Sequence, residues 1–167
     1  GDGISGNDLI YIPRNKDEMN FEQYSSGGNT FTVQQQKDAW EAYIQQDNYL
    51  SKNRGSYAER NGALLGMVTR FDLSAMIELF RNIGKQRHTI QVRADIFNIG
   101  NMINPSWGVG YVVNNTSPLA ARGYIPATGA PVFRMNTVDN KLNYTTTRRG
   151  TSLIDVWQAQ FGVRYIF

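Results

Sequence analysis

Three of the 14 Asp and Glu residues, Asp72, Glu78 and Asp95, are candidates for paired carboxylates in acid–base chemistry. Two carboxylates a few ångströms apart can act as general acid and as base or nucleophile, as they do in glycoside hydrolysis. Here, however, each of them stands in a segment in which apolar and polar residues alternate, and Arg93 and Arg164 stand in such segments as well. Alternation of this kind indicates charges on the polar face of β-strands, so we expect no catalytic residue.

The sequence offers little for a metal or a cofactor. It contains one histidine, His88, and no cysteine, which excludes a cluster of histidines, a Cys-based zinc site, a thiol nucleophile and a disulfide framework. The glycines of "GVG" at 108–110 lack the G-x-G-x-x-G spacing of a dinucleotide-binding loop. We therefore predict no metal site and no bound cofactor, and we expect that the protein is not an enzyme.

The formal net charge of the 167 residues is +3, and the basic residues are scattered along the sequence. A nucleic-acid interface needs a clustered basic face, whereas the one adjacent basic pair here is Arg148–Arg149, so we predict no nucleic-acid partner. No apolar run reaches the roughly 18 residues of a transmembrane helix, and no signal peptide opens the sequence. With 12% aromatic and 19% charged residues, the composition favours β-structure with long polar loops.

Three segments alternate regularly enough to be predicted as strands: "FDLSAMIELF" (71–80), "TIQVRADIF" (89–97) and "VWQAQFGVRYIF" (156–167). Their lengths are close to the roughly 9–11 residues of a tilted strand that crosses a bilayer. Gly84–Lys85, in the polar stretch between the first two segments, favours a turn. We therefore predict antiparallel pairing of residues 71–80 with 89–98. The apolar face of the third segment comprises Trp157, Ala159, Phe161, Val163, Tyr165 and Phe167.

Very long connections contrast with this short turn. About seventy residues precede the first segment, and nearly sixty separate the second from the third. Short turns at one end of the strands and long loops at the other are typical of transmembrane β-barrels. In the first connection, Thr32 and Gln35 form a capping-box pattern that predicts a helix over about 33–46. In the second, we expect residues 105–113 to pair as a strand with residues 131–136.

Six pieces of the sequence, in this order, resemble the C-terminal end of TonB-dependent outer-membrane receptors of the Bacteroidetes, first the SusC-like group and then the related Oar-like group. They span almost the whole chain, and the most specific are "RGSYAERNG", "DIFNIGNMIN" and "GVRYIF". One departure is that members of the family usually carry a Pro-Trp pair soon after the "ERNG" element, where this chain has "ALLGMVTRFDL". The pieces are "NDLIYIPRN", "YIQQDNYLSKNRGSYAERNGA", "FDLSAMIELF", "HTIQVRADIFNIGNMIN", "WGVGY" and "WQAQFGVRYIF".

The resemblance implies a large closed barrel of about 22 strands around a plug, of which this chain supplies about three. The expected fold is therefore mainly β, with the antiparallel C-terminal strands of a transmembrane barrel, long extracellular loops and one short helix in the N-terminal loop. Residues 1–167 are expected to be a single C-terminal barrel fragment. Within it, residues 1–67 form a long loop with the helix, and residues 68–167 form the last strands and a further long loop.

The implied function is nutrient import, of glycans or peptides, in the outer membrane of a Gram-negative bacterium. The implied partners are the rest of the parent barrel and its plug, a SusD-type surface lipoprotein, TonB through an N-terminal part outside this chain, the barrel-assembly machinery and membrane lipid. The alternative prediction is a soluble β-domain whose exposed Trp and Tyr residues stack on a carbohydrate. A second sheet covering the apolar strand faces would favour this alternative.

The resemblance also assigns roles to residues of the three segments. The end of the last strand would face lipid and carry the signal read by the assembly machinery, and the charges of the polar faces would point into the lumen. The lipid-facing and signal residues are Trp157, Phe161, Val163, Tyr165 and Phe167, and the lumen-facing charges are Asp72, Glu78, Arg93, Asp95 and Arg164.

Overall fold

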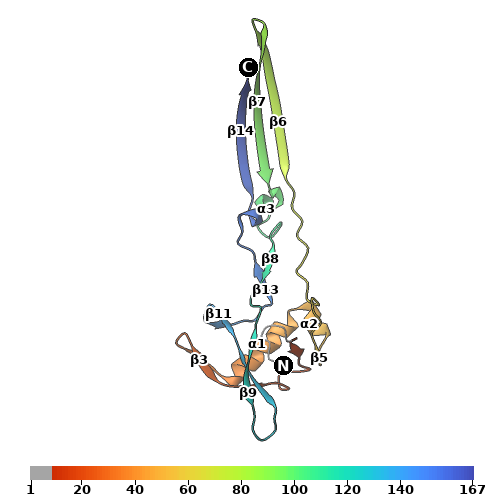
Figure 1. The fold of residues 1–167 in the computed structure, drawn as a ribbon, viewed down its shortest axis with the longest axis vertical. Helices are drawn as coiled ribbons and strands as arrows, with labels where there is room; N and C mark the ends of the chain where they lie inside the picture. The colour runs from red at the N-terminus through yellow and green to blue at the C-terminus, as the bar shows by residue number, and fades with distance from the viewer. Residues whose placement is uncertain (1–8) are drawn as a thin grey trace. The chain divides into compact units, whose positions relative to one another are not determined.

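The computed structural model describes residues 9–167 and divides the chain into two compact units (Figure 1). The first, here called the helix unit, combines residues 9–65 with residues 112–148. The second, here called the sheet unit, combines residues 66–111 with residues 149–167. Strands predominate and most pairs are antiparallel, in open sheets of two or three strands. The expectation of a mainly β, antiparallel chain is therefore confirmed.

The helix unit contains most of the short strands. They form one three-stranded sheet, β2–β10–β9, and three two-stranded sheets, β1–β5, β3–β4 and β11–β12. Strand β2 runs parallel to β10, and β9 runs antiparallel to β10. The elements are β1 (Tyr11–Ile12), β2 (Asn20–Phe21), β3 (Tyr24–Ser26), β4 (Asn29–Phe31), α1 (Val33–Gln45), α2 (Asn48–Lys52), β5 (Ser56–Tyr57), β9 (Leu119–Tyr124), β10 (Pro131–Met135), β11 (Thr137–Val138) and β12 (Lys141–Leu142).

Helix α1 forms where the capping box predicted it. Thr32 has an extended backbone, and its hydroxyl accepts the Gln35 N–H at 3.2 Å. In return, the Gln35 side-chain oxygen accepts the Thr32 N–H at 2.9 Å. Two backbone donors that the first helical turn leaves free are thereby satisfied. The prediction of a helix over about 33–46 is confirmed.

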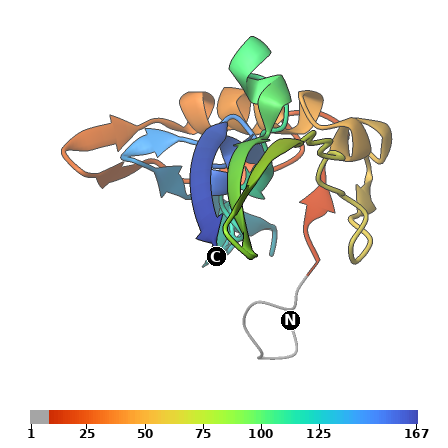
Figure 2. The ribbon, with the colours of Figure 1, turned by 90° about the horizontal axis from the view of Figure 1, so that it is seen from above.

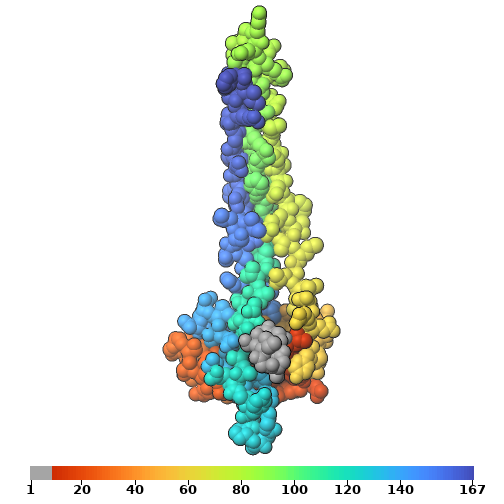
Figure 3. All heavy atoms as spheres, in the orientation of Figure 1, coloured from red at the N-terminus to blue at the C-terminus, as the bar shows by residue number. Residues whose placement is uncertain are grey.

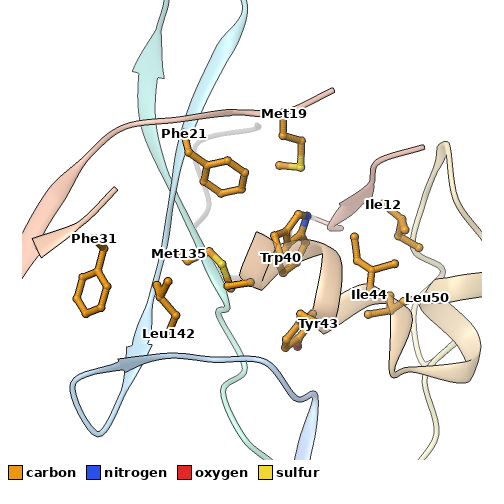
Figure 4. Close-up of a cluster of buried hydrophobic side chains, with 11 residues drawn as sticks. Ile12, Met19, Phe21, Phe31, Trp40, Tyr43, Ile44, Leu50, Met135 and Leu142 are labelled. Carbon is orange, nitrogen blue, oxygen red and sulfur yellow. The ribbon is translucent and has the colours of Figure 1, made fainter. Parts of the chain in front are cut away.

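The core of the helix unit is built around one face of α1 (Figure 4). Four residues of the helix, Ala39, Trp40, Tyr43 and Ile44, are buried, and their spacing is that of a single helical face. The rings of Trp40 and Tyr43 stack with their centroids 5.0 Å apart. The part expected as a long loop therefore has a hydrophobic core of its own. The other members of the cluster are Ile12, Met19, Phe21, Phe31, Leu50, Met135 and Leu142.

A fully buried glutamine, Gln36, connects α1 to two neighbouring strands of one sheet, β2 and β10. Its side-chain Nε2 donates to the carbonyl of Glu22 at 2.7 Å, and its Oε1 accepts the Met135 N–H at 3.1 Å. Both backbone groups would otherwise lack a partner inside the unit. The amide therefore fixes the distance between α1 and the β2–β10 pair.

Replacing Gln36 with leucine should lower the free energy of unfolding by about 1–3 kcal/mol for each buried backbone group left without a partner. Urea denaturation followed by circular dichroism measures the change. The matched control is Gln45→Leu, at an exposed position of the same helix, which should shift the midpoint little. Equal shifts for the two variants would contradict the structural role of Gln36.

The sheet unit is dominated by three long strands in the order β14–β7–β6 (Figures 1 and 2). The predicted antiparallel pairing is confirmed, and it runs without a break from Leu73↔Ile96 to Ile83↔Gln86. The strands extend further than expected, so only Gly84–Lys85 remain as the turn. Gly84 has φ +64°, as the first central residue of a type II′ hairpin turn requires. The elements of this unit are β6 (Leu73–Ile83), β7 (Gln86–Phe97), α3 (Ile99–Ile103), the 3₁₀ turn η1 (Leu153–Asp155) and β14 (Gln158–Ile166).

The boundary between the units falls within β8 (Tyr111–Val113) and β13 (Thr147–Arg149), which pair with one another. The expected pairing of residues 105–113 with 131–136 is wrong. Residues 119–124 form a strand of their own, β9, which reaches β10 through a short hairpin connection. A hairpin partner close in sequence has a lower loop-closure cost than a distant one.

Candidate functional site

The three long strands of the sheet unit pair in a register that joins their apolar faces. Residues directly opposite each other in a sheet share a face, and the middle row here is Ile77↔Val92↔Val163. Two rows on one side of it and one row on the other obey the same rule, with Tyr165 in the single row. The combined apolar face comprises Leu73, Ala75, Ile77, Leu79, Ile90, Val92, Ala94, Ile96, Ala159, Phe161, Val163 and Tyr165.

This apolar face is exposed. The exposed fraction is 63% for Ile77, 78% for Phe161 and 75% for Val163. Figure 3 shows one side of these strands with their heavy atoms drawn as spheres. Monomeric soluble proteins rarely leave a contiguous apolar patch of this extent uncovered. The face therefore has the character of an interaction surface.

The opposite face of the sheet is mostly polar and internally hydrogen-bonded, although Met76, Phe80 and Ile166 also lie on it. The Ser74 hydroxyl donates to Asp95 at 2.6 Å, and Arg93 forms an ion pair with Asp95 at 2.8 Å. Gln91 donates to Glu78. Arg164 lies opposite Gln91 on this face. Four of the five charges assigned to a lumen thus share one face, while their exposure to a lumen stays a prediction.

Asp72, the fifth of these charges, lies outside the strand. It precedes β6, and its carboxylate accepts the Asn98 N–H at 2.8 Å. Asp72 therefore accepts a hydrogen bond from the backbone just after β7 and links the start of β6 to the end of β7.

Aromatic residues lie near both ends of the apolar face. Trp157 precedes β14 at one end, whereas Tyr165 and Phe167 stack at the other with centroids 5.6 Å apart. The Tyr165 hydroxyl lies 2.5 Å from Nδ1 of His88, a contact that the sequence did not predict. The expected lipid-facing residues are therefore brought together on one face or beside it, and their role in assembly stays a prediction.

Both outer edges of the three-stranded sheet are free in the part of the chain that the structure describes. β14 pairs only with β7 on one side, and β6 pairs only with β7 on the other. Each edge presents a row of backbone N–H and C=O groups that can pair with a further strand.

A cluster of hydrogen bonds around Asp155 fixes the backbone just before β14. The sequence did not predict this cluster. One carboxylate oxygen accepts the Gly110 N–H at 2.8 Å and pairs with Arg70 at 2.7 Å, and the other accepts the Ser152 N–H at 3.2 Å. These bonds, the Gly110 N–H first, hold the pKa of Asp155 below its usual range. A Cβ at Gly150 would lie 2.3 Å from this carboxylate. The capping pattern Ser152-x-x-Asp155 was the signal that could have revealed it.

The helix unit contains a cavity of about 790 Å³. Tyr11, Tyr57 and Phe133 line it together with the carboxylate of Glu18, which accepts the Tyr11 hydroxyl at 2.9 Å. The rings of Tyr11 and Tyr57 meet edge to face at 5.3 Å. This arrangement has room for a small ligand and brings together no pair of acid and base.

No helix within residues 9–167 is long and apolar enough to cross a membrane. Comparison of the chain with protein-family models, with curated proteins and with solved structures gives no match.

Proposed function

We propose that the chain is the C-terminal portion of a SusC-like, or related Oar-like, TonB-dependent receptor that imports nutrients across the outer membrane. In this proposal β6, β7 and β14 are the last strands of its barrel. The observation that carries the proposal is the register that joins three apolar strand faces into one uncovered surface. The sequence resemblance names the family, and the sheet supports the membrane role.

The two faces of the sheet differ as the lipid-facing side and the lumen-facing side of a barrel wall do. A barrel strand alternates lipid-facing apolar residues with lumen-facing polar residues. Here the apolar face is exposed, while Ser74, Arg93 and Asp95 hydrogen-bond on the other face. In water, a sheet of this kind would bury its apolar face under a second layer, and no such layer covers it within residues 9–167. The alternative of a soluble module lacks the covering sheet that would favour it.

The dimensions and edges of the sheet also fit a barrel. The strands have 11, 12 and 9 residues, close to the roughly 9–11 residues of a tilted spanning strand. The free edge of β14 would pair with the first strand of the barrel, and that of β6 with the strand before it. The two-residue turn between β6 and β7 would face the periplasm, and the long connections, which contain the helix unit, would face the exterior.

The function of such a receptor would be uptake of glycans or peptides, with a SusD-type surface lipoprotein contacting the external loops. Contact with TonB, and the plug, would belong to parts outside this chain. A soluble carbohydrate-binding domain remains the second candidate, because the cavity beside Tyr11 and Tyr57 offers aromatic rings and a carboxylate to a sugar. That candidate gives no account of the exposed apolar face.

Single cysteines placed along β14 test the membrane role, since these 167 residues contain none. In the outer membrane, an environment-sensitive fluorophore on Phe161→Cys or Val163→Cys should report an apolar surrounding and be quenched by lipid-bound quenchers. The same fluorophore on Gly162→Cys or Arg164→Cys should report water. The measurement uses the complete protein, with any other cysteine replaced, in outer-membrane preparations. A signal that does not alternate along the strand would refute the proposal.

A further inference from the structure

Charges are segregated along the sheet unit. The end formed by the turn between β6 and β7 carries only basic side chains, since no Asp or Glu occurs in residues 79–94 or 156–167. The carboxylates Asp72, Asp95 and Asp155 lie toward the opposite end, while Glu78 and Arg164 flank Gln91 in the middle of the strands. The basic side chains of the turn end are Arg81, Lys85 and Arg87.

The apolar face itself terminates in this basic end. The row after Leu79↔Ile90 on the same face is Arg81↔His88, only about 7 Å further along the strands. Lys85 follows in the turn. From the centre of the sheet outward, the face therefore passes from aliphatic side chains to Tyr165 and then to Arg81 and Lys85, with Ile83 between these two cations.

These cations lack acidic partners. Within residues 9–167, Arg81, Lys85 and Arg87 form no ion pair, and all three are exposed. Arg87 lies over the ring of Phe80, with its guanidinium carbon 4.4 Å from the centroid. Arg93, further along the same strand, is by contrast neutralised by Asp95. The positive charge at the turn is thus available to an external anion.

We propose that this end of the sheet binds the phosphate of an anionic phospholipid headgroup, with Arg81 and Lys85 as its main contacts. The inference rests on the proposed lipid-facing role of the apolar face, along which the acyl chains would lie. Charge complementarity selects the partner, because an anionic membrane surface attracts each nearby Lys or Arg. Tyr165, hydrogen-bonded to His88, would lie at the level of the headgroups, where aromatic side chains of barrels gather.

The test is flotation of the full chain with vesicles of phosphatidylcholine alone and of phosphatidylcholine mixed with phosphatidylglycerol. The chain should bind the mixed vesicles more tightly. The double variant Arg81→Gln, Lys85→Gln should lose about fivefold in partition coefficient per residue on the mixed vesicles. It should bind the neutral vesicles as the parent chain does.

The matched control removes the same charge from exposed positions of the helix unit: Arg60→Gln, Lys141→Gln. This variant should keep the preference for the mixed vesicles, and circular dichroism checks that both variants are folded. Equal binding of the parent chain to both vesicles, or equal losses in the two variants, would overturn the inference and leave the lipid-facing role intact. Absence of binding to either vesicle would overturn both.

Discussion

Replacement of Trp40 by alanine should lower the free energy of unfolding by about 3–5 kcal/mol, the range for loss of a large aromatic side chain from a core. Trp40 is 1% exposed, lies at the centre of the α1 face and stacks on Tyr43. The smaller side chain would leave a cavity between α1 and the side chains of Ile12 and Met135, both of which are fully buried. Urea denaturation followed by circular dichroism measures the effect, because the tryptophan fluorescence itself changes.

Trp107→Ala is the matched control, since Trp107 is 55% exposed and belongs to the sheet unit. Its replacement should change the free energy of unfolding by no more than about 0.5 kcal/mol, as surface substitutions usually do. Similar losses for the two variants would show that the helix unit is not organised around α1.

On the proposed function, introduction of an arginine at Val163 should strongly reduce the amount of the protein found in the outer membrane. Val163 lies in the middle row of the apolar face, where an arginine in contact with lipid costs about 2–4 kcal/mol at the bilayer midplane. Quantitative immunoblotting of outer-membrane fractions measures the amount assembled.

Gln160→Arg provides the control on the same strand. Gln160 lies on the polar face opposite Asp95, so a new cation there has a favourable neighbour and should leave the assembled amount unchanged. In a soluble domain both positions would face water, and both substitutions would have effects within about 0.5 kcal/mol. Equal behaviour of the two variants would therefore speak for the soluble alternative.

The elements with a regular local pattern could be predicted from the sequence. The period-two alternation around Ile77 and Val92 predicted strands and their antiparallel pairing, because a shift by one residue would move every apolar side chain to the other face. The capping box at Thr32 predicted the start of α1, because its hydrogen bonds join residues three apart. In both cases the determining interactions lie within a short stretch of chain.

The fold of the helix unit could not be predicted in the same way. Its strands are mostly two or three residues long, too short to show a period. Its sheet places Asn20 beside Val132, a pairing that depends on packing between distant segments. The hydrogen bonds of Gln36 likewise become visible only once Met135 is in place. The Asp155 cluster at the candidate site was missed because Arg70 and Gly110 reach it from far along the sequence.

The construction of the helix unit from two separate chain segments sets an order of folding. The β6–β7 hairpin joins residues that are three to 23 positions apart, whereas the bond from Met135 to Gln36 spans 99 positions. Local contacts form fast, and those of high contact order form late. During synthesis, which begins at the N-terminus, the apolar face of α1 therefore stays exposed until residue 135 has been added. During that interval the face of Trp40 and Ile44 is available to a chaperone or to aggregation. The speed at which the chain is completed beyond residue 135 therefore becomes a determinant of yield.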